Sequence, residues 1–167
     1  WTLHNKAGAV VQEVSPLGNP AQPGNAHKTT YVLDARHRVT SVIDGQGDIV
    51  RENVYGEDDL LVEVKVPDPV SKGTNLVRAA FFEYTARKEM KTRSDRDFNA
   101  TRFEYGALPG QVACVWDTLN RPTRTDYDPL TQRPRQVTDA VGFSGQRVTR
   151  QVWEQGLATE TQVFNPE

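Results

Sequence analysis

The triplets Phe82-Glu83-Tyr84, Phe103-Glu104-Tyr105 and Thr125-Asp126-Tyr127 recur at a nearly constant spacing in this 167-residue chain. Their tyrosines are 21 and 22 residues apart, and Tyr31 and Tyr55 precede them. A fixed period of about 20 to 50 residues is typical of one supersecondary unit stacked on copies of itself. We therefore predict a repeat protein in which all 5 tyrosines mark the same position of the unit.

Four-residue turns headed by aspartate fall between the tyrosines. An aspartate at the head of a turn accepts a hydrogen bond from the backbone two residues on, and glycine or asparagine at the end tolerates a positive φ. Two such turns in each unit imply two strands in each unit. The expected turns begin at Asp34, Asp44, Asp95, Asp117 and Asp139, and two of them end in glycine, at Gly47 and Gly142.

The composition indicates a thin sheet with one buried face. Hydrophobic residues make up 37% of the chain and the mean hydropathy is −0.63, which is low for a compact globule. The 20 basic and 22 acidic side chains are spread along the sequence, so we expect no nucleic-acid partner and no polybasic membrane patch. No apolar run is long enough to cross a bilayer, so no direct membrane insertion is expected. The chain begins at Trp1 without Met or a signal sequence, which indicates a piece of a longer protein.

Alternation of side chains predicts strands between the turns. Residues 38–43, 49–55, 60–66 and 146–153 have the strand pattern, and Pro and Gly predict loop insertions near residues 18–28 and 67–75. A helix is the alternative for residues 85–96, which are rich in Lys, Arg and Glu. Both ends of the chain carry weaker units, in the last of which Trp153 takes the place of tyrosine, and this gives about seven units in a single repeat region.

Within each copy, the residues two and four positions before the tyrosine share its face, as Thr101 and Phe103 do with Tyr105 and as Ala80 and Phe82 do with Tyr84. Superposing the copies stacks these side chains in rows across adjacent strands. Each cross-strand pair contributes roughly 0.2 to 1 kcal/mol. We expect these rows to form the core.

The markers resemble the YD-repeat, or Rhs-repeat, family, whose unit reads approximately Tyr-Asp-x-x-Gly-Arg-Leu followed by Thr-Asp-x-x-Gly. The resemblance covers nearly the whole chain. The best matches are residues 116–122, Tyr127-Asp128 with residues 138–142, and residues 31–34 with Arg38-Val39 and residues 44–47. The chain departs from the pattern at Gly56, Thr85 and Gly106, which replace the aspartate, and at His37, Lys88 and Gln132, which replace the glycine.

The resemblance implies an all-β fold in which antiparallel strand-turn-strand repeats form a continuous sheet that spirals into a hollow shell. In this family such shells belong to large secreted bacterial toxins and enclose a C-terminal toxic domain. Examples are Rhs effectors of interbacterial competition and type VI secretion, and the B and C subunits of insecticidal toxin complexes. This chain would be a secreted arc of such a shell, with the remaining repeats and an enclosed toxin polypeptide as its partners.

No catalytic residue is carried over from the family. Its members often self-cleave with aspartates of a separate core motif, whereas Asp128-Pro129-Leu130 of this chain fits the repeat itself. Cys114 has apolar neighbours and no adjacent base or cation that would make it reactive. The histidines lack metal-ligand spacing and the acidic turns lack a calcium-loop pattern. We therefore predict no enzyme, cofactor or metal site; the residues concerned are His4, His27, His37, 57–59 and 95–97.

A different class of function is a surface adhesion or glycan-binding module built from the same repeat. Exposed Trp1, Trp116 or Trp153 would then stack on sugars, whereas a shell needs most of these rings packed against the sheet. A small enzyme is a third class. Gly45-Gln46-Gly47 precedes no helix start and Phe143-Ser144-Gly145 lacks a strand-to-helix context, so neither glycine motif supports it.

Overall fold

Fourteen β-strands make up the computed structural model, which describes residues 2–14, 28–70, 75–142, 144, 146–154 and 157–164. None of these residues forms a helix, and so none forms one that could cross a membrane. Neighbouring strands are antiparallel, and they form one open sheet in the order of the chain. The predicted all-β class with antiparallel strands is confirmed. The strands are β1 Thr2–His4, β2 Val10–Val14, β3 Lys28–Leu33, β4 Val39–Ile43, β5 Ile49–Tyr55, β6 Leu61–Pro67, β7 Leu76–Tyr84, β8 Met90–Asp95, β9 Ala100–Tyr105, β10 Val112–Trp116, β11 Pro122–Tyr127, β12 Pro134–Asp139, β13 Arg147–Glu154 and β14 Leu157–Phe164.

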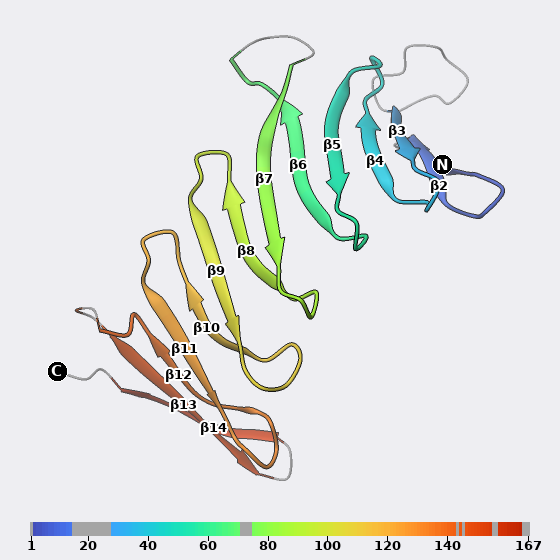
Figure 1. Ribbon diagram of the computed structural model, residues 1–167. Helices are drawn as coiled ribbons and strands as arrows, with labels where there is room; N and C mark the ends of the chain where they lie inside the picture. Colours follow the sequence, from blue (N-terminus) through green and yellow to red (C-terminus); the bar gives the residue numbers. More distant parts are fainter. Residues whose placement is uncertain are drawn as a thin grey trace. The chain divides into compact units, whose positions relative to one another are not determined.

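The chain divides into two compact units, Trp1–Phe82 and Glu83–Glu167. The first contains β1 to β6 and most of β7, and the second contains β8 to β14. Within each unit, every strand lies beside the strand that precedes it in the sequence (Figure 1). Sequential hairpins of this kind need only local contacts, because each strand pairs across a short turn.

The strand bounds follow the alternation seen in the sequence. β4, β5, β6 and β13 each begin and end within one residue of their predicted positions. The helix considered for residues 85–96 is not formed. That stretch contains a turn and then β8, along which exposed Lys91, Arg93 and Asp95 alternate with half-buried Thr92 and Ser94. Period-two alternation suits a strand and would not give a helix a continuous apolar stripe.

The two predicted insertions begin and end at slightly different residues. Pro67 is the last residue of β6, so the second loop starts at Asp68, whose N–H donates to the Asn75 carbonyl over 2.9 Å. Lys28 belongs to β3 and not to the first loop. The rest of that loop, residues 18–27, lies outside the described part of the chain.

The core is thin, as expected for a single-layer sheet. Among the described residues, the buried side chains are Val14 and Cys114, each 5% exposed, together with Asn53 and Thr138. The predicted rows of aromatic and threonine side chains differ from expectation in one respect. Equivalent residues lie on alternate strands, so Phe103 of β9 lies opposite Val115 of β10, which in turn lies opposite Thr123 of β11. Since each unit contributes two strands, the intervening strand supplies every second member of a row.

Candidate functional site

Seven of the described turns share one backbone geometry. The first residue donates its N–H to the carbonyl of the fifth and accepts from the N–H of the fourth, as Asp34 does with Arg38 and His37. The fourth residue has a positive φ in every case, which defines a type I turn followed by a left-handed bulge residue. His37 and Lys88 adopt φ of 62° and 63°, so these turns keep the left-handed residue without the glycine of the repeat pattern. The first residues are Asn5, Asp34, Asp44, Gly56, Thr85, Asp95 and Asp117.

The side chain of the first residue fixes most of these turns. In the Asp117 turn, Oδ1 accepts from the N–H groups of Leu119 and Arg121 at 2.9 and 2.8 Å. Asp34, Asp44, Asp95 and Asn5 make the same pair of bonds, and Thr85 makes longer ones through Oγ1. Hydrogen bonds stabilise the ionised carboxylate, so the pKa of Asp34, Asp95 and Asp117 lies below its usual value.

Two other aspartates that match the repeat pattern, Asp128 and Asp139, depart from this geometry. Asp128 heads a turn that is one residue longer, in which Oδ1 accepts from the N–H groups of Leu130 and Thr131, and these bonds lower its pKa. Asp139 is the last residue of β12, and its carboxylate accepts from Arg147 Nη2 at 3.0 Å. Gly142 has a φ of 79°.

The tyrosines at the ends of β5, β9 and β11 reach back to the preceding strand. Tyr127 donates its hydroxyl to the Val112 carbonyl at 3.0 Å, and Tyr105 donates to that of Met90 at 2.7 Å. Tyr55 donates to the Val39 carbonyl at 3.0 Å, which also accepts from Asn53 Nδ2. Val39 and Val112 each border a register shift in the ladder. The tyrosine hydroxyl thus supplies a partner for a carbonyl at the point where the regular pairing is interrupted.

Tyr31 departs from the expected equivalence of the tyrosines. It lies within β3, opposite Val42, and its hydroxyl donates to Glu13 Oε2 at 2.7 Å, whereas Leu33 precedes the Asp34 turn. The hydrogen bond with Glu13 raises the pKa of Tyr31. Tyr84 ends β7 and precedes the Thr85 turn, and burial raises its pKa. Trp153 pairs with Ala158 within β13 and β14.

The turns that follow the odd-numbered strands are joined to one another by polar contacts. In the first unit, Arg36 and Arg38 both pair with Asp59 of the next such turn. In the second unit, Glu89 Oε1 accepts from Gly110 N–H at 2.7 Å, and Gln111 Nε2 donates to Gln132 Oε1 at 2.8 Å. These contacts hold neighbouring repeats together at their turns as well as through the ladder.

Charged side chains of the first unit form ion pairs across adjacent strands. Lys65 Nζ of β6 lies 2.8 Å from Glu52 Oε1 of β5, and Arg78 Nε of β7 lies 2.9 Å from Glu63 Oε1 of β6. The hydrogen bond with Glu52 raises the pKa of Lys65. Opposite charges therefore stand on neighbouring strands in this part of the sheet.

On one of its faces, the second unit places its charges on alternate strands. Residues 101–105, 123–127 and 149–153 share the pattern Thr-Arg-x-x-aromatic and lie in β9, β11 and β13. Along one row Glu104, Cys114 and Arg124 lie opposite one another, and along the next row Asp126, Gln136 and Arg150 do. Residues opposite one another share a face. We call the side chains of Arg102, Glu104, Arg124, Asp126 and Arg150 the charged face of the second unit. The recurring pentapeptide is a sequence signal from which this face could have been found.

The charged face contains no ion pair among the residues that the structure describes. Arg102 Nη2 donates to Asn120 Oδ1 at 2.7 Å, and Arg150 Nε donates to Gln136 Oε1 at 2.9 Å. Glu104, Arg124 and Asp126 make no side-chain hydrogen bond within the described ranges and are exposed. Cys114 is buried between two of these charges. Burial raises the pKa of its thiol, the Glu104 carboxylate raises it further and Arg124 opposes both.

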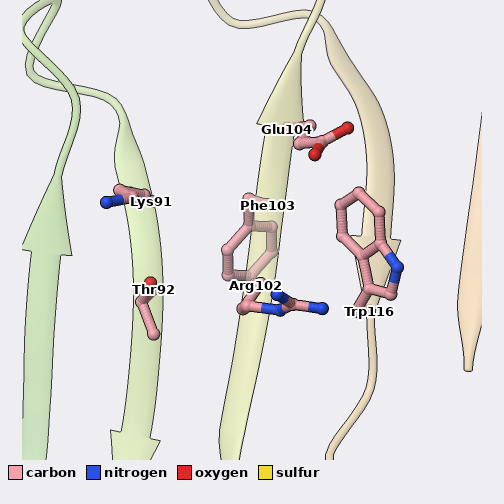
Figure 2. Close-up of a pocket in the computed structure, with 6 residues that line it drawn as sticks. All are labelled: Lys91, Thr92, Arg102, Phe103, Glu104 and Trp116. Atoms are coloured by element: carbon pink, nitrogen blue, oxygen red, sulfur yellow. The ribbon is translucent and has the colours of Figure 1, made fainter. Parts of the chain in front are cut away.

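A shallow hollow of about 140 Å³ opens beside Trp116 and is lined by residues of β8, β9 and β10 (Figure 2). The Arg102 guanidinium carbon lies 5.1 Å from the centre of the Trp116 ring, and Figure 2 shows this side chain directed toward the ring. Half-buried Trp116 is thus stacked with an arginine of its own chain, which reduces the free ring face that a sugar would need. Trp1 lies outside the described residues.

A second hollow, of about 350 Å³, is lined by Asp126, Tyr127, Arg135, Gln136 and Arg150. Neither hollow contains a nucleophile beside a base. In the described part of the chain no three His, Cys, Asp or Glu side chains come together as metal ligands would. What the two hollows share is charge on a β surface, which suits recognition of a polar partner better than chemistry.

Comparison with known proteins identifies the fold. No family model matches this sequence, and no curated protein matches it either. The chain is similar to a chain in the crystal structure of TcdB2-TccC3-Cdc42, with a TM-score of 0.60 and 13% identity over 98% of this chain. It is also similar to TcdB2-TccC3 without the hypervariable C-terminal region, with a TM-score of 0.65 and 13% identity over 89% of this chain. The matches span 11% and 8% of those chains, so the sequence corresponds to a small part of each. At this identity the likeness shows a shared β-sheet repeat fold.

Proposed function

We propose that this chain is a structural segment of a YD-repeat shell that encloses and shields the toxin polypeptide of a secreted bacterial toxin. The observation that carries the proposal is the repeated hairpin, with its aspartate-headed turn and tyrosine-to-carbonyl bond, in a sheet whose fold resembles TcdB2-TccC3 over 98% of the chain. The remaining repeats of the shell and the enclosed toxin are its partners. The segment itself performs no catalysis, binds no nucleic acid and inserts into no membrane.

A single-layer sheet with a thin core suits a wall. It has few fully buried side chains, so it can be extended by further hairpins without a separate core for each one. Continued pairing would also cover the edge strands β1 and β14, which otherwise present unpaired backbone groups. Interbacterial competition and export by type VI secretion are the biological setting that we propose for such a shell.

Limited proteolysis of the full-length product of the gene that contains this sequence tests the proposal. A shell protects the enclosed polypeptide, so a C-terminal fragment should survive protease that digests the same fragment when it is expressed alone. A control sample that is first unfolded in denaturant should lose the protection. Digestion of the fragment at the same rate in the intact protein and in isolation would contradict enclosure.

A further inference from the structure

We infer that the charged face of the second unit binds an extended polypeptide that carries acidic and basic side chains three residues apart. This inference rests on the proposed function, because the occupant is of the kind that a shell would enclose. The arginines and acids of the face are exposed, and three of its five members have no side-chain partner in the described ranges. The paired charges of the first unit have no such capacity.

The acid and the arginine of each row stand on alternate strands, and they do not pair in the structure. Strands lie about 4.8 Å apart, so an acid and an arginine on alternate strands have Cα atoms roughly 10 Å apart. The intervening Cys114 and Gln136 are neutral and so provide no intermediate charge. Each acid–neutral–arginine row therefore presents a negative and a positive group at a fixed separation.

An unfolded polypeptide matches that separation. Polyproline II is a major conformer of unfolded chains, with three residues per turn and a rise of about 3.1 Å per residue. Residues i and i+3 then lie on one side of the peptide about 9 Å apart. If the peptide lies across the strands, its Lys at i would contact Glu104 and its Glu at i+3 would contact Arg124. A separate segment of the polypeptide, displaced by two residues along β11, would meet Asp126 and Arg150 in the same way.

The alternation of negative and positive side chains on the face favours a polypeptide of mixed charge over a polyanion. Glu104 and Asp126 alternate with Arg102, Arg124 and Arg150, so a run of phosphates would be repelled at every second position. The opposite face of β9 to β12 carries Thr101, Phe103, Val115, Thr123 and Val137. Asp139 of β12 lies on that face too, and its ion pair with Arg147 of β13 closes its charge. Recognition is therefore assigned to one face.

The test titrates this chain with the synthetic peptide (Lys-Ala-Pro-Glu-Ala-Pro)₃. Binding is monitored by NMR, through the chemical shifts of the arginine side-chain Nε–Hε groups. Binding should shift the resonances of Arg102, Arg124 and Arg150. A control peptide of the same composition, (Lys-Glu-Ala-Pro-Ala-Pro)₃, places its opposite charges next to each other and should bind more weakly. Arg124→Gln should weaken binding of the first peptide roughly two- to fivefold, as expected for exposed charge pairs.

Arg93→Gln is the matched control, because Arg93 is exposed on β8 and lies opposite Thr101 on the other face. It should leave binding unchanged, and circular dichroism should show that all variants keep their strand content. Glu104→Gln provides a second variant if Arg124→Gln fails to fold. Equal affinity for the two peptides, shifts confined to the opposite face, or tighter binding of polyglutamate or oligo(dT) would overturn the inference. These outcomes leave protease protection of the intact protein unaffected, so the two proposals fail separately.

Discussion

The two units of the chain use the same hairpin, but the second has a face on which opposite charges do not pair. In the first unit Glu52 pairs with Lys65 and Glu63 pairs with Arg78, because acid and base stand on adjacent strands. On the charged face of the second unit, acid and arginine stand on alternate strands and remain apart, whereas Asp139 of β12 pairs with Arg147 of β13 on the other face. The backbone ladder is the same in both, so the side chain on the intervening strand decides whether a charge is closed within the sheet or available to a partner. One repeat can thus close its charges within the sheet in one place and leave them open to a partner in another.

The largest expected difference between the two units is in their stability at low pH. The second unit holds three aspartates whose turn hydrogen bonds depress their pKa, namely Asp95, Asp117 and Asp128, whereas the first holds Asp34. A depressed folded pKa gives stability that is present above the unfolded value of about 3.9 and is lost as pH falls through the folded value. Amide hydrogen exchange between pH 5 and about pH 2 should therefore show protection lost first in β8 to β14. Simultaneous loss in both units, or earlier loss in the first, would contradict a turn-based origin of acid sensitivity.

The next largest effect is expected at the neutral residue between the charges. Cys114 is 5% exposed, and Cys114→Asp would place a carboxylate there beside Glu104. Burial and Glu104 oppose ionisation and Arg124 offsets them in part, so we expect a loss of about 1 to 2 kcal/mol in the free energy of unfolding. Cys114→Ser, which adds no charge, is the control and should cost less. Urea denaturation measures both, and equal costs for Asp and Ser would show that charge at this site is tolerated.

The tyrosine bonds should differ between the units as well. Tyr127→Phe removes the side-chain donor to the Val112 carbonyl and should cost about 1 kcal/mol. Tyr55→Phe should cost less, because Asn53 Nδ2 still donates to the Val39 carbonyl at 2.8 Å. Thermal denaturation of the two variants gives the comparison directly. A larger loss for Tyr55→Phe would mean that the tyrosine acts through packing instead of through its hydroxyl.

The smallest effect concerns the ion pairs themselves. Lys65→Met removes a cross-strand pair and should destabilise the first unit by about 0.2 to 1 kcal/mol. Arg124→Met removes an unpaired charge of the second unit and should leave the free energy of unfolding unchanged within error. Urea denaturation at low and high salt separates the two, because only the loss in Lys65→Met should shrink with salt. Equal costs would show that the pairing difference has no energetic consequence.

The sequence predicted the strands because turn chemistry is local. In most of the seven turns a polar side chain at the first position and a left-handed residue at the fourth define the hairpin, even where His37 or Lys88 replaces glycine. The strand register could not be predicted in the same way, because it depends on β-bulges that no single residue indicates. The shift between Val32 and Leu33 and the placement of Tyr31 against Glu13 could not be read from the spacing of tyrosines. Nor could the charge pairing, since the sequence shows which residues alternate along a strand and not which ones lie opposite across the sheet.

Electron cryo-microscopy of the intact gene product tests the shell proposal most directly. The expected map shows a closed β wall around internal density, with this chain in the wall and Arg102, Arg124 and Arg150 directed toward that density. An open or solid assembly without enclosed polypeptide would contradict the proposed function. A shell in which those arginines point outward would contradict the assigned face.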